Sequence, residues 1–163
     1  IILDATEDME PYATEVYQTL LNTLLMREPH QAIGLTVYQG DYLECYHEDY
    51  LNLKVIDTLP NFKKTGGASR AITHVLQSLL RRNDRSEQSL NVKITYIGSG
   101  CNVAEDHQLK RRRDQAIKSA LWLNWGFDLI AFGHSPAVCR RTIGFDATNR
   151  PLTYREAAIH HDV

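Results

Sequence analysis

The sequence predicts a doubly wound α/β domain with a mostly parallel sheet, helices on both faces and one antiparallel hairpin at the sheet edge. Three observations carry this prediction. Short β-rich segments alternate with longer segments of helical period, which is the order found in parallel α/β folds. The first strand, expected at residues 1–5, is apolar apart from Asp4 near its end, as in a sheet covered on both sides. Gly40-Asp41 separates two β-rich segments and indicates a hairpin turn.

The expected elements follow one another without a linker, an internal repeat or a low-complexity segment. We expect strands at residues 1–5, 32–39, 42–48, 91–100 and 126–133. We expect helices at residues 9–26, 69–82, 108–124 and 153–161. Ser69 is the expected N-cap of the second helix, and Thr153 with Glu156 forms a capping-box pattern for the last. We therefore expect a single domain over residues 1–163, and the sequence leaves open that it is part of a longer protein.

Composition excludes several classes of function. The chain has 163 residues, of which 43% are hydrophobic and 23% charged, with a net charge of −2. Such a balance gives no overall field for nucleic acid or an anionic membrane, and no apolar run is long enough to span a bilayer. Cys45, Cys101 and Cys139 are widely spaced and odd in number. We therefore expect reduced thiols and a cytoplasmic protein.

The stretch "LDATEDM" places oxygen ligands at alternate positions where the first strand ends: Asp4, Thr6 and Asp8. Two further loops, "TGGAS" at 65–69 and "GSGCN" at 98–102, are expected at the same edge of the sheet. Ligands of open α/β sheets bind outside the carboxyl ends of the strands. Carboxylates and hydroxyls converging there are what a hard cation such as Mg²⁺ requires.

These motifs resemble those of the von Willebrand factor A-type (vWA) domain. The resemblance rests on a strand ending "LDAT..M.PY", a "GL..Y" strand and hairpin, and "TGG.S" opening a second helix, and it extends over nearly the whole chain. It implies a Rossmann-like vWA fold and a metal-ion-dependent adhesion site (MIDAS), in which a bound metal receives a partner's carboxylate. It also implies a protein-interaction role, as in the intracellular members that act as scaffolds or as adaptors for ATP-driven machines.

The resemblance places Asp4 and Thr6 on the first two metal ligands, and the remaining positions depart from the family pattern. Asp8 stands where the family has Ser. Ala68 stands where a Thr follows the Gly pair, so Ser69 or Thr65 would have to substitute. The fourth strand lacks the family's Asp, and its substitutes would come from nearby polar residues: Ser99, Asn102, Glu105 or Asp106.

We therefore predict a degenerate adhesion site, either metal-free or with Mg²⁺ held by Asp4, Thr6, Asp8 and Ser69. A partner protein would bind at Asp8, Thr65, Ser69, Ser99 and Asn102. Two carboxylates would neutralise much of the charge of a cation, so a neutral or basic partner fits better than an acidic one. In the competing interpretation, Asp8 caps the first helix and Asp4 hydrogen-bonds to neighbouring loops.

An enzyme hypothesis also fits part of the pattern. Asp4-x-Thr6 after an apolar strand resembles the nucleophile loop of haloacid-dehalogenase-type, Mg²⁺-dependent phosphohydrolases. That resemblance implies that Asp4 attacks phosphorus. The supporting residues would be Thr95 or Ser99 for phosphate, Lys110, and Glu105 with Asp106 for Mg²⁺. Most members of that family have a second Asp at the position of Thr6, and this Asp acts as the general acid. Threonine cannot take that role. Since no residue set supplies nucleophile, base and oxyanion donor together, we predict that the chain is not an enzyme.

The basic run "KRRR" at 110–113, with Arg81, Arg82, Arg140 and Arg141, is the remaining charged feature. Four consecutive helical residues point in different directions, so we interpret the run as a solvated helix face rather than a nucleic-acid site. We interpret Trp122 and Trp125 as packing residues.

Overall fold

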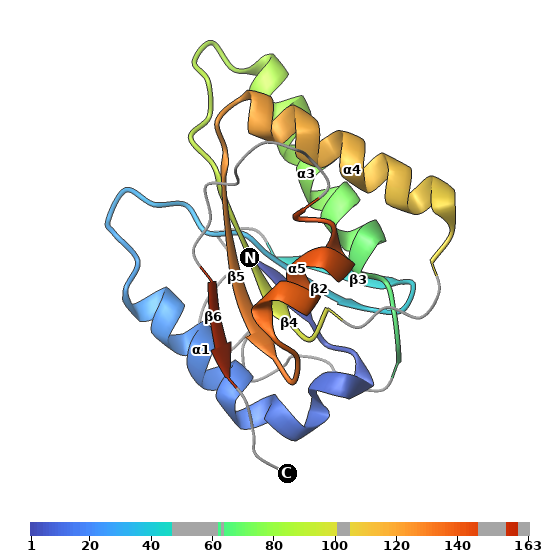
Figure 1. Cartoon of the computed structure of the whole chain (residues 1–163). Coiled ribbons are helices and arrows are strands. Elements are labelled where there is room, and N and C mark those ends of the chain that lie inside the picture. The colour runs from blue at the N-terminus through green and yellow to red at the C-terminus, as the bar shows by residue number, and fades with distance from the viewer. Residues whose placement is uncertain (47–61, 63, 101–104, 147–155, 160–163) are drawn as a thin grey trace.

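In the part of the chain that the structure describes, six strands form one sheet in the order β3-β2-β1-β4-β5-β6 (Figure 1). The computed structural model describes residues 1–46, 62, 64–100, 105–146 and 156–159. The strands are β1 (Ile2–Asp4), β2 (Leu35–Gln39), β3 (Tyr42–Tyr46), β4 (Lys93–Gly98), β5 (Gly126–Phe132) and β6 (Glu156–Ile159). Among the described strands, only the β2–β3 pair is antiparallel, and the other pairs are parallel. The predicted fold class and the hairpin at Gly40-Asp41 are therefore confirmed.

Helices cover both faces of the sheet (Figure 1). They are η1 (Glu7–Tyr12, a 3-10 helix), α1 (Ala13–Leu25), α3 (Ala68–Arg85), α4 (His107–Trp122) and α5 (Pro136–Ile143). Apolar residues of α3, α4 and α5 pack on one face in a core that includes Trp125 and Phe127. Met9 of η1 with Val16 and Leu20 of α1 pack on the other. This layering explains why every residue of β1 and β2 is buried.

The predicted C-terminal helix at 153–161 is wrong for the residues that the structure describes there. Glu156–Ile159 form β6, which pairs in parallel with β5 from Leu129↔Glu156 to Phe132↔Ile159. Pairing with β5 supplies backbone hydrogen bonds to an otherwise open sheet edge, and this tertiary gain overrides the local capping pattern. The rest of the predicted segment, which includes Thr153, lies outside the described residues.

Two expected helix starts are shifted, and the two tryptophans differ in burial. Gly67, not Ser69, is the N-cap of α3, with a φ of 104° that favours glycine. Thr6 is the N-cap of η1, so Asp8 lies inside that helix and does not cap it. Trp125 is buried, and its indole N–H donates to the carbonyl of Leu90 at 3.2 Å. Trp122 is 79% exposed, so of the two tryptophans only Trp125 is a core residue.

Two smaller expectations can be compared with the structure. Within the described ranges, no helix has the length and the apolar character needed to cross a bilayer. Cys45 is exposed and Cys139 buried, and both are free thiols. Cys101 lies outside the described residues.

Candidate functional site

Asp4 is the centre of a buried hydrogen-bond network at the carboxyl edge of the sheet. It ends β1 and has 0% exposure. One carboxylate oxygen accepts from the Thr6 backbone N–H at 2.8 Å and from the Thr6 hydroxyl at 2.5 Å. The other accepts from the Ser99 backbone N–H at 3.1 Å and from the Ser99 hydroxyl at 2.9 Å. The first and third predicted loops therefore do converge, as the parallel sheet requires.

Two tyrosines extend this network beneath the edge. The hydroxyls of Tyr38 and Tyr96 lie 2.7 Å apart, and the Gly100 N–H donates to the Tyr96 hydroxyl at 3.1 Å. Tyr96 also lies 3.4 Å from the second oxygen of Asp4. A Cβ at Gly98 would come within 2.3 Å of the Asp4 Cβ, so only glycine permits this close approach.

Burial sets the protonation of these groups. Loss of hydration raises the pKa of Asp4, and the hydrogen bonds from Thr6 and Ser99 act in the opposite direction by stabilising the carboxylate. Burial also raises the pKa of both Tyr38 and Tyr96, and the nearby Asp4 carboxylate adds to that shift. Both tyrosines therefore remain neutral and act as hydrogen-bonding groups rather than as bases.

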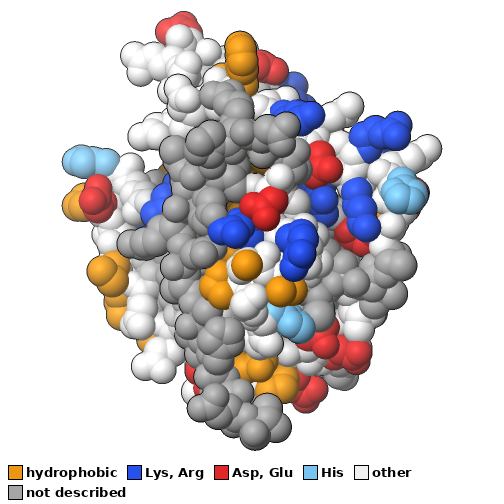
Figure 2. All heavy atoms as spheres, in the orientation of Figure 1, with side chains coloured by type: hydrophobic (Ala, Val, Ile, Leu, Met, Phe, Trp, Pro, Cys, Tyr) orange, Lys and Arg blue, Asp and Glu red, His pale blue; other side chains and the backbone are white. Residues whose placement is uncertain are grey.

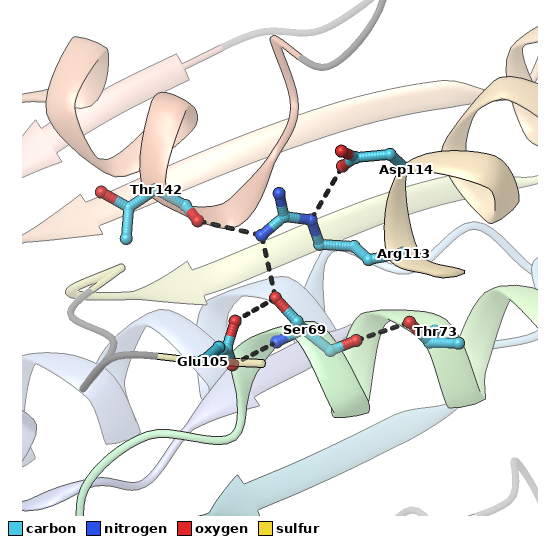
Figure 3. Close-up of polar contacts among 6 residues, drawn as sticks. All are labelled: Ser69, Thr73, Glu105, Arg113, Asp114 and Thr142. Atoms are coloured by element: carbon cyan, nitrogen blue, oxygen red, sulfur yellow. Dashed lines mark hydrogen bonds and ion pairs between the residues drawn. The ribbon is translucent and has the colours of Figure 1, made fainter. Parts of the chain in front are cut away.

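A second polar cluster fastens the start of α3 to α4 and to the end of α5 (Figure 3). The Ser69 N–H donates to Glu105 at 3.1 Å, and the Ser69 hydroxyl donates to the other oxygen of the same carboxylate. Arg113, 5% exposed, donates from Nη1 to the Ser69 hydroxyl at 2.8 Å and to the Thr142 carbonyl at 3.1 Å. Its Nε lies 3.0 Å from Asp114. A buried cation thus stands beside Ser69.

The exposed part of the edge is formed by η1 and the loop before α3. The Glu7 N–H donates to the Lys64 carbonyl at 2.7 Å, which joins the two segments. Asp8 and Thr65 are exposed there. Ser69 and Ser99 are buried, at 0% and 2% exposure. Asn102 lies outside the described residues. Of the predicted partner-binding residues in the described ranges, only Asp8 and Thr65 present their side chains to solvent.

The comparisons with known proteins give a match at the level of structure. No protein-family model matches the sequence, and no curated protein does. The crystal structure of the SpRpn10 VWA domain superposes with a TM-score of 0.64, covering 98% of this chain and 85% of that chain at 17% sequence identity. The fold is von Willebrand factor A-like. At this identity the likeness shows the fold alone, so the site of this vWA-like domain must be understood from its own contacts.

Those contacts fit a metal ion poorly. Both oxygens of Asp4 already accept from backbone and hydroxyl donors, and the Thr6 hydroxyl donates to Asp4. The Ser69 hydroxyl is engaged by Glu105 and by the cationic Arg113. Among the described residues, no three His, Cys, Asp or Glu side chains are placed to hold a metal together. Mg²⁺ binding by Asp4, Thr6, Asp8 and Ser69 therefore stays a prediction that the geometry does not favour.

The phosphohydrolase hypothesis meets the same obstacle at Asp4. A nucleophile must be reachable by its substrate, and this carboxylate has no exposed surface. Ser99 does contact Asp4. Thr95 lies on β4 three residues before Gly98, the residue that approaches Asp4. It lines a separate cavity of about 310 Å³ together with Lys93 and Asp128. The two acidic candidates are engaged elsewhere, Glu105 with Ser69, and Asp106 as the N-cap of α4, accepting from the Gln108 N–H at 2.9 Å.

Sequence reasoning missed Arg113, Tyr38 and Tyr96 as members of these clusters. Arg113 had a usable signal. It lies four residues after Leu109 and three before Ala116, on the apolar stripe of its helix, where an arginine must be buried and paired. Tyr38 and Tyr96 had no comparable signal, because tyrosine is common in β-strands and neither position breaks the β-rich pattern around it.

Proposed function

We propose that this vWA-like domain is a protein-interaction module that binds a partner at the carboxyl edge of its sheet without a metal ion, and that it is not an enzyme. The observation that carries this proposal is that buried and exposed polar residues at this edge have different roles. The buried Asp4 and Ser69 clusters hold the loops in place, while η1 and the loop before α3 present exposed polar side chains around Asp8 and Thr65.

We call the exposed surface formed by η1, the loop before α3 and the β2–β3 hairpin turn the rim. Its charge favours a basic or neutral partner. Glu7, Asp8 and Glu10 are all exposed on η1. Asp41, in the adjacent hairpin turn, has a fully exposed side chain, 3.5 Å from Arg70. Lys64, next to Thr65, is an exposed cation in the same region. Clustered carboxylates at an interface attract cations and repel acidic groups. The partner site therefore comprises Asp8 and Thr65 as contacts, with Ser69 and Ser99 as the residues that position the loops.

Site-directed photo-crosslinking tests this proposal. A photoreactive residue replaces Thr65 in the full chain expressed in its natural host, and the same residue at the exposed Glu87, in the loop after α3, serves as the matched control. We expect a protein partner cross-linked from position 65 and not from 87, with EDTA leaving the yield unchanged and Asp8→Lys reducing it at least fivefold. Equal cross-linking from both positions would contradict a partner site at this edge. Loss of the cross-link in EDTA would contradict a metal-free one.

A further inference from the structure

The outer surfaces of α3 and α4 form two neighbouring cationic stripes. Five exposed residues of α3 follow one helical line, with an arginine at both ends: Arg70, His74, Gln77, Arg81 and Arg85. The exposed acid Asp84 lies on the same side of the helix. The exposed line of α4 is Arg111, Gln115, Lys118 and Trp122. Spacings of three and four residues place each set on one side of its helix. We call these nine residues the α3–α4 surface.

Both stripes point away from the same face of the sheet. The inward residues of α3, such as Ile72 and Leu76, and of α4, such as Ile117, belong to one apolar core. The two helices therefore lie in one layer, and their solvent-facing sides are on the same side of the molecule. Figure 2, in the orientation of Figure 1, shows Lys and Arg side chains spread over α4 and α5 on the viewed face.

The charge of this layer is opposite to that of the rest of the chain. The helices α3 and α4 contain nine of the 18 Lys and Arg residues but only two of the 20 Asp and Glu residues. They therefore carry +7, whereas the remainder of the chain carries −9. One of the two acids, Asp114, is bonded to the buried Arg113. A field divided in this way orients an approaching partner and suppresses wrong ones.

The cations of the surface are mostly not neutralised internally. Arg70 lies near Asp41, but Arg81, Arg85, Arg111 and Lys118 make no ion pair within the described part of the chain. Trp122 ends the α4 stripe with 79% of its surface exposed. Lys118 precedes it by one helical turn, so the end of this stripe offers apolar area next to a positive charge, and tryptophan is enriched at binding hot spots.

We propose that the α3–α4 surface docks an acidic protein segment. Helices of 18 and 16 residues extend for about 27 and 24 Å. A segment of about eight extended residues, or of about 16 helical ones, has a matching length. Nucleic acid fits less well, because a long polyanion would continue beyond the two helices and meet the acidic remainder of the chain. The α3–α4 surface differs from the acidic rim around Asp8, so the domain receives partners of opposite charge at two places.

Titration with a defined probe tests this proposal. The probe is a fluorescein-labelled 16-residue peptide with eight glutamates and two leucines, and its control has glutamine in place of glutamate. We expect the acidic peptide to bind the full chain with a micromolar Kd that weakens with salt, and the glutamine peptide to bind at least tenfold more weakly. We expect Arg111→Glu with Lys118→Glu to weaken binding of the acidic peptide at least tenfold. The matched control reverses two exposed cations elsewhere, Arg27→Glu with Lys64→Glu, and should change Kd less than twofold.

Trp122→Ala separates aromatic contact from charge, and it should weaken binding about fivefold while leaving the salt dependence unchanged. Unfolding midpoints of all variants check that each is folded, since every substituted side chain is exposed. No saturable binding up to 1 mM peptide would overturn the proposal, as would equal weakening by both double variants. Tighter binding of 16-base-pair DNA than of the peptide, lost in the Arg111 and Lys118 variant, would assign the surface to nucleic acid instead. Self-association in ultracentrifugation that this variant abolishes, without peptide binding, would assign it to a second copy of the chain.

Discussion

The carboxyl edge of the sheet and the α3–α4 surface use charged side chains in opposite ways. At the edge, Asp4 is fully buried, and its oxygens accept hydrogen bonds from Thr6 and Ser99. On the α3–α4 surface, Arg111 and Lys118 are exposed and make no ion pair among the described residues. The edge carries the recognisable motif, yet its central carboxylate is occupied within the fold. The surface carries no motif, yet its charges remain available to a partner.

This difference shows that a motif specifies residue types only. Whether a side chain is available to a ligand depends on the groups that the fold places beside it. A charged group that is buried must be paired, and pairing consumes the interactions that a ligand would otherwise receive. An exposed charge keeps its hydration and contributes little to stability, so it costs little to keep for binding. Stability measurements should therefore separate the two regions.

The largest expected effect is a difference in stability between substitutions of two arginines in the basic run at 110–113. Arg113→Ala should lower the free energy of unfolding by about 3 kcal/mol, because it removes the buried cation that joins Ser69, Thr142 and Asp114. Arg111→Ala, its exposed neighbour, should change the same quantity by less than about 0.5 kcal/mol. Urea denaturation followed by circular dichroism measures both. Similar small losses in the two variants would mean that the cluster does not hold the helices together.

Much of the fold could be predicted because its signals are local. The apolar first strand, the Gly40-Asp41 turn and the helical periods each follow from a few neighbouring residues. The helix α5 had local signals too, with Ser135 as N-cap, Pro136 at the first turn and Gly144 at the C-cap with a φ of 85°. These signals are ambiguous, because serine and proline, as in His134-Ser135-Pro136, are equally common in turns. The strand β6 had none, since its conformation depends on pairing with β5.

The candidate site could be predicted only as far as sheet topology reaches. Parallel strands bring their carboxyl ends to one edge, so the contact between Asp4 and Ser99 followed from strand order. The bond between Ser69 and Glu105 spans 36 residues and depends on the path of a loop. No local pattern specifies that path. The sequence alone therefore could not show whether the side-chain oxygens of Asp4, Thr6 and Ser69 face solvent or bond to neighbouring groups.

A smaller effect is expected from the protonation of Asp4. Burial raises its pKa in the folded protein above the ordinary value of 3.8. Between 3.8 and the raised pKa, the folded state binds more protons than the unfolded state, so the free energy of unfolding should fall as the pH rises through this interval. The loss should be absent from Asp4→Asn, which does not titrate.

Urea denaturation of the wild type and Asp4→Asn at pH values from 3 to 8 measures this difference. The substitution also weakens hydrogen bonds with Thr6 and Ser99, but that cost does not vary with pH. Other titrating groups are common to both proteins and cancel. The stability of the wild type relative to Asp4→Asn should therefore decline as the pH rises. A relative stability that instead increases would mean that the four donors lower the pKa more than burial raises it.

The smallest expected effect is that of Mg²⁺ on the Tm. Its size decides whether the polar groups at the carboxyl edge bind only one another or can also bind a cation. A cation bound only to the native state at 100 times its Kd stabilises it by about 2.7 kcal/mol. For a domain of this size that corresponds to a rise in Tm of about 5–10 °C. We expect no rise when 5 mM Mg²⁺ replaces EDTA, either in the wild type or in Asp8→Ala. A rise in the wild type that Asp8→Ala removes would show that the exposed Asp8 carboxylate can join the buried ligands. The hydrogen bonds of Asp4 would then have to rearrange around the ion, and the contrast between an occupied edge and an available α3–α4 surface would no longer hold.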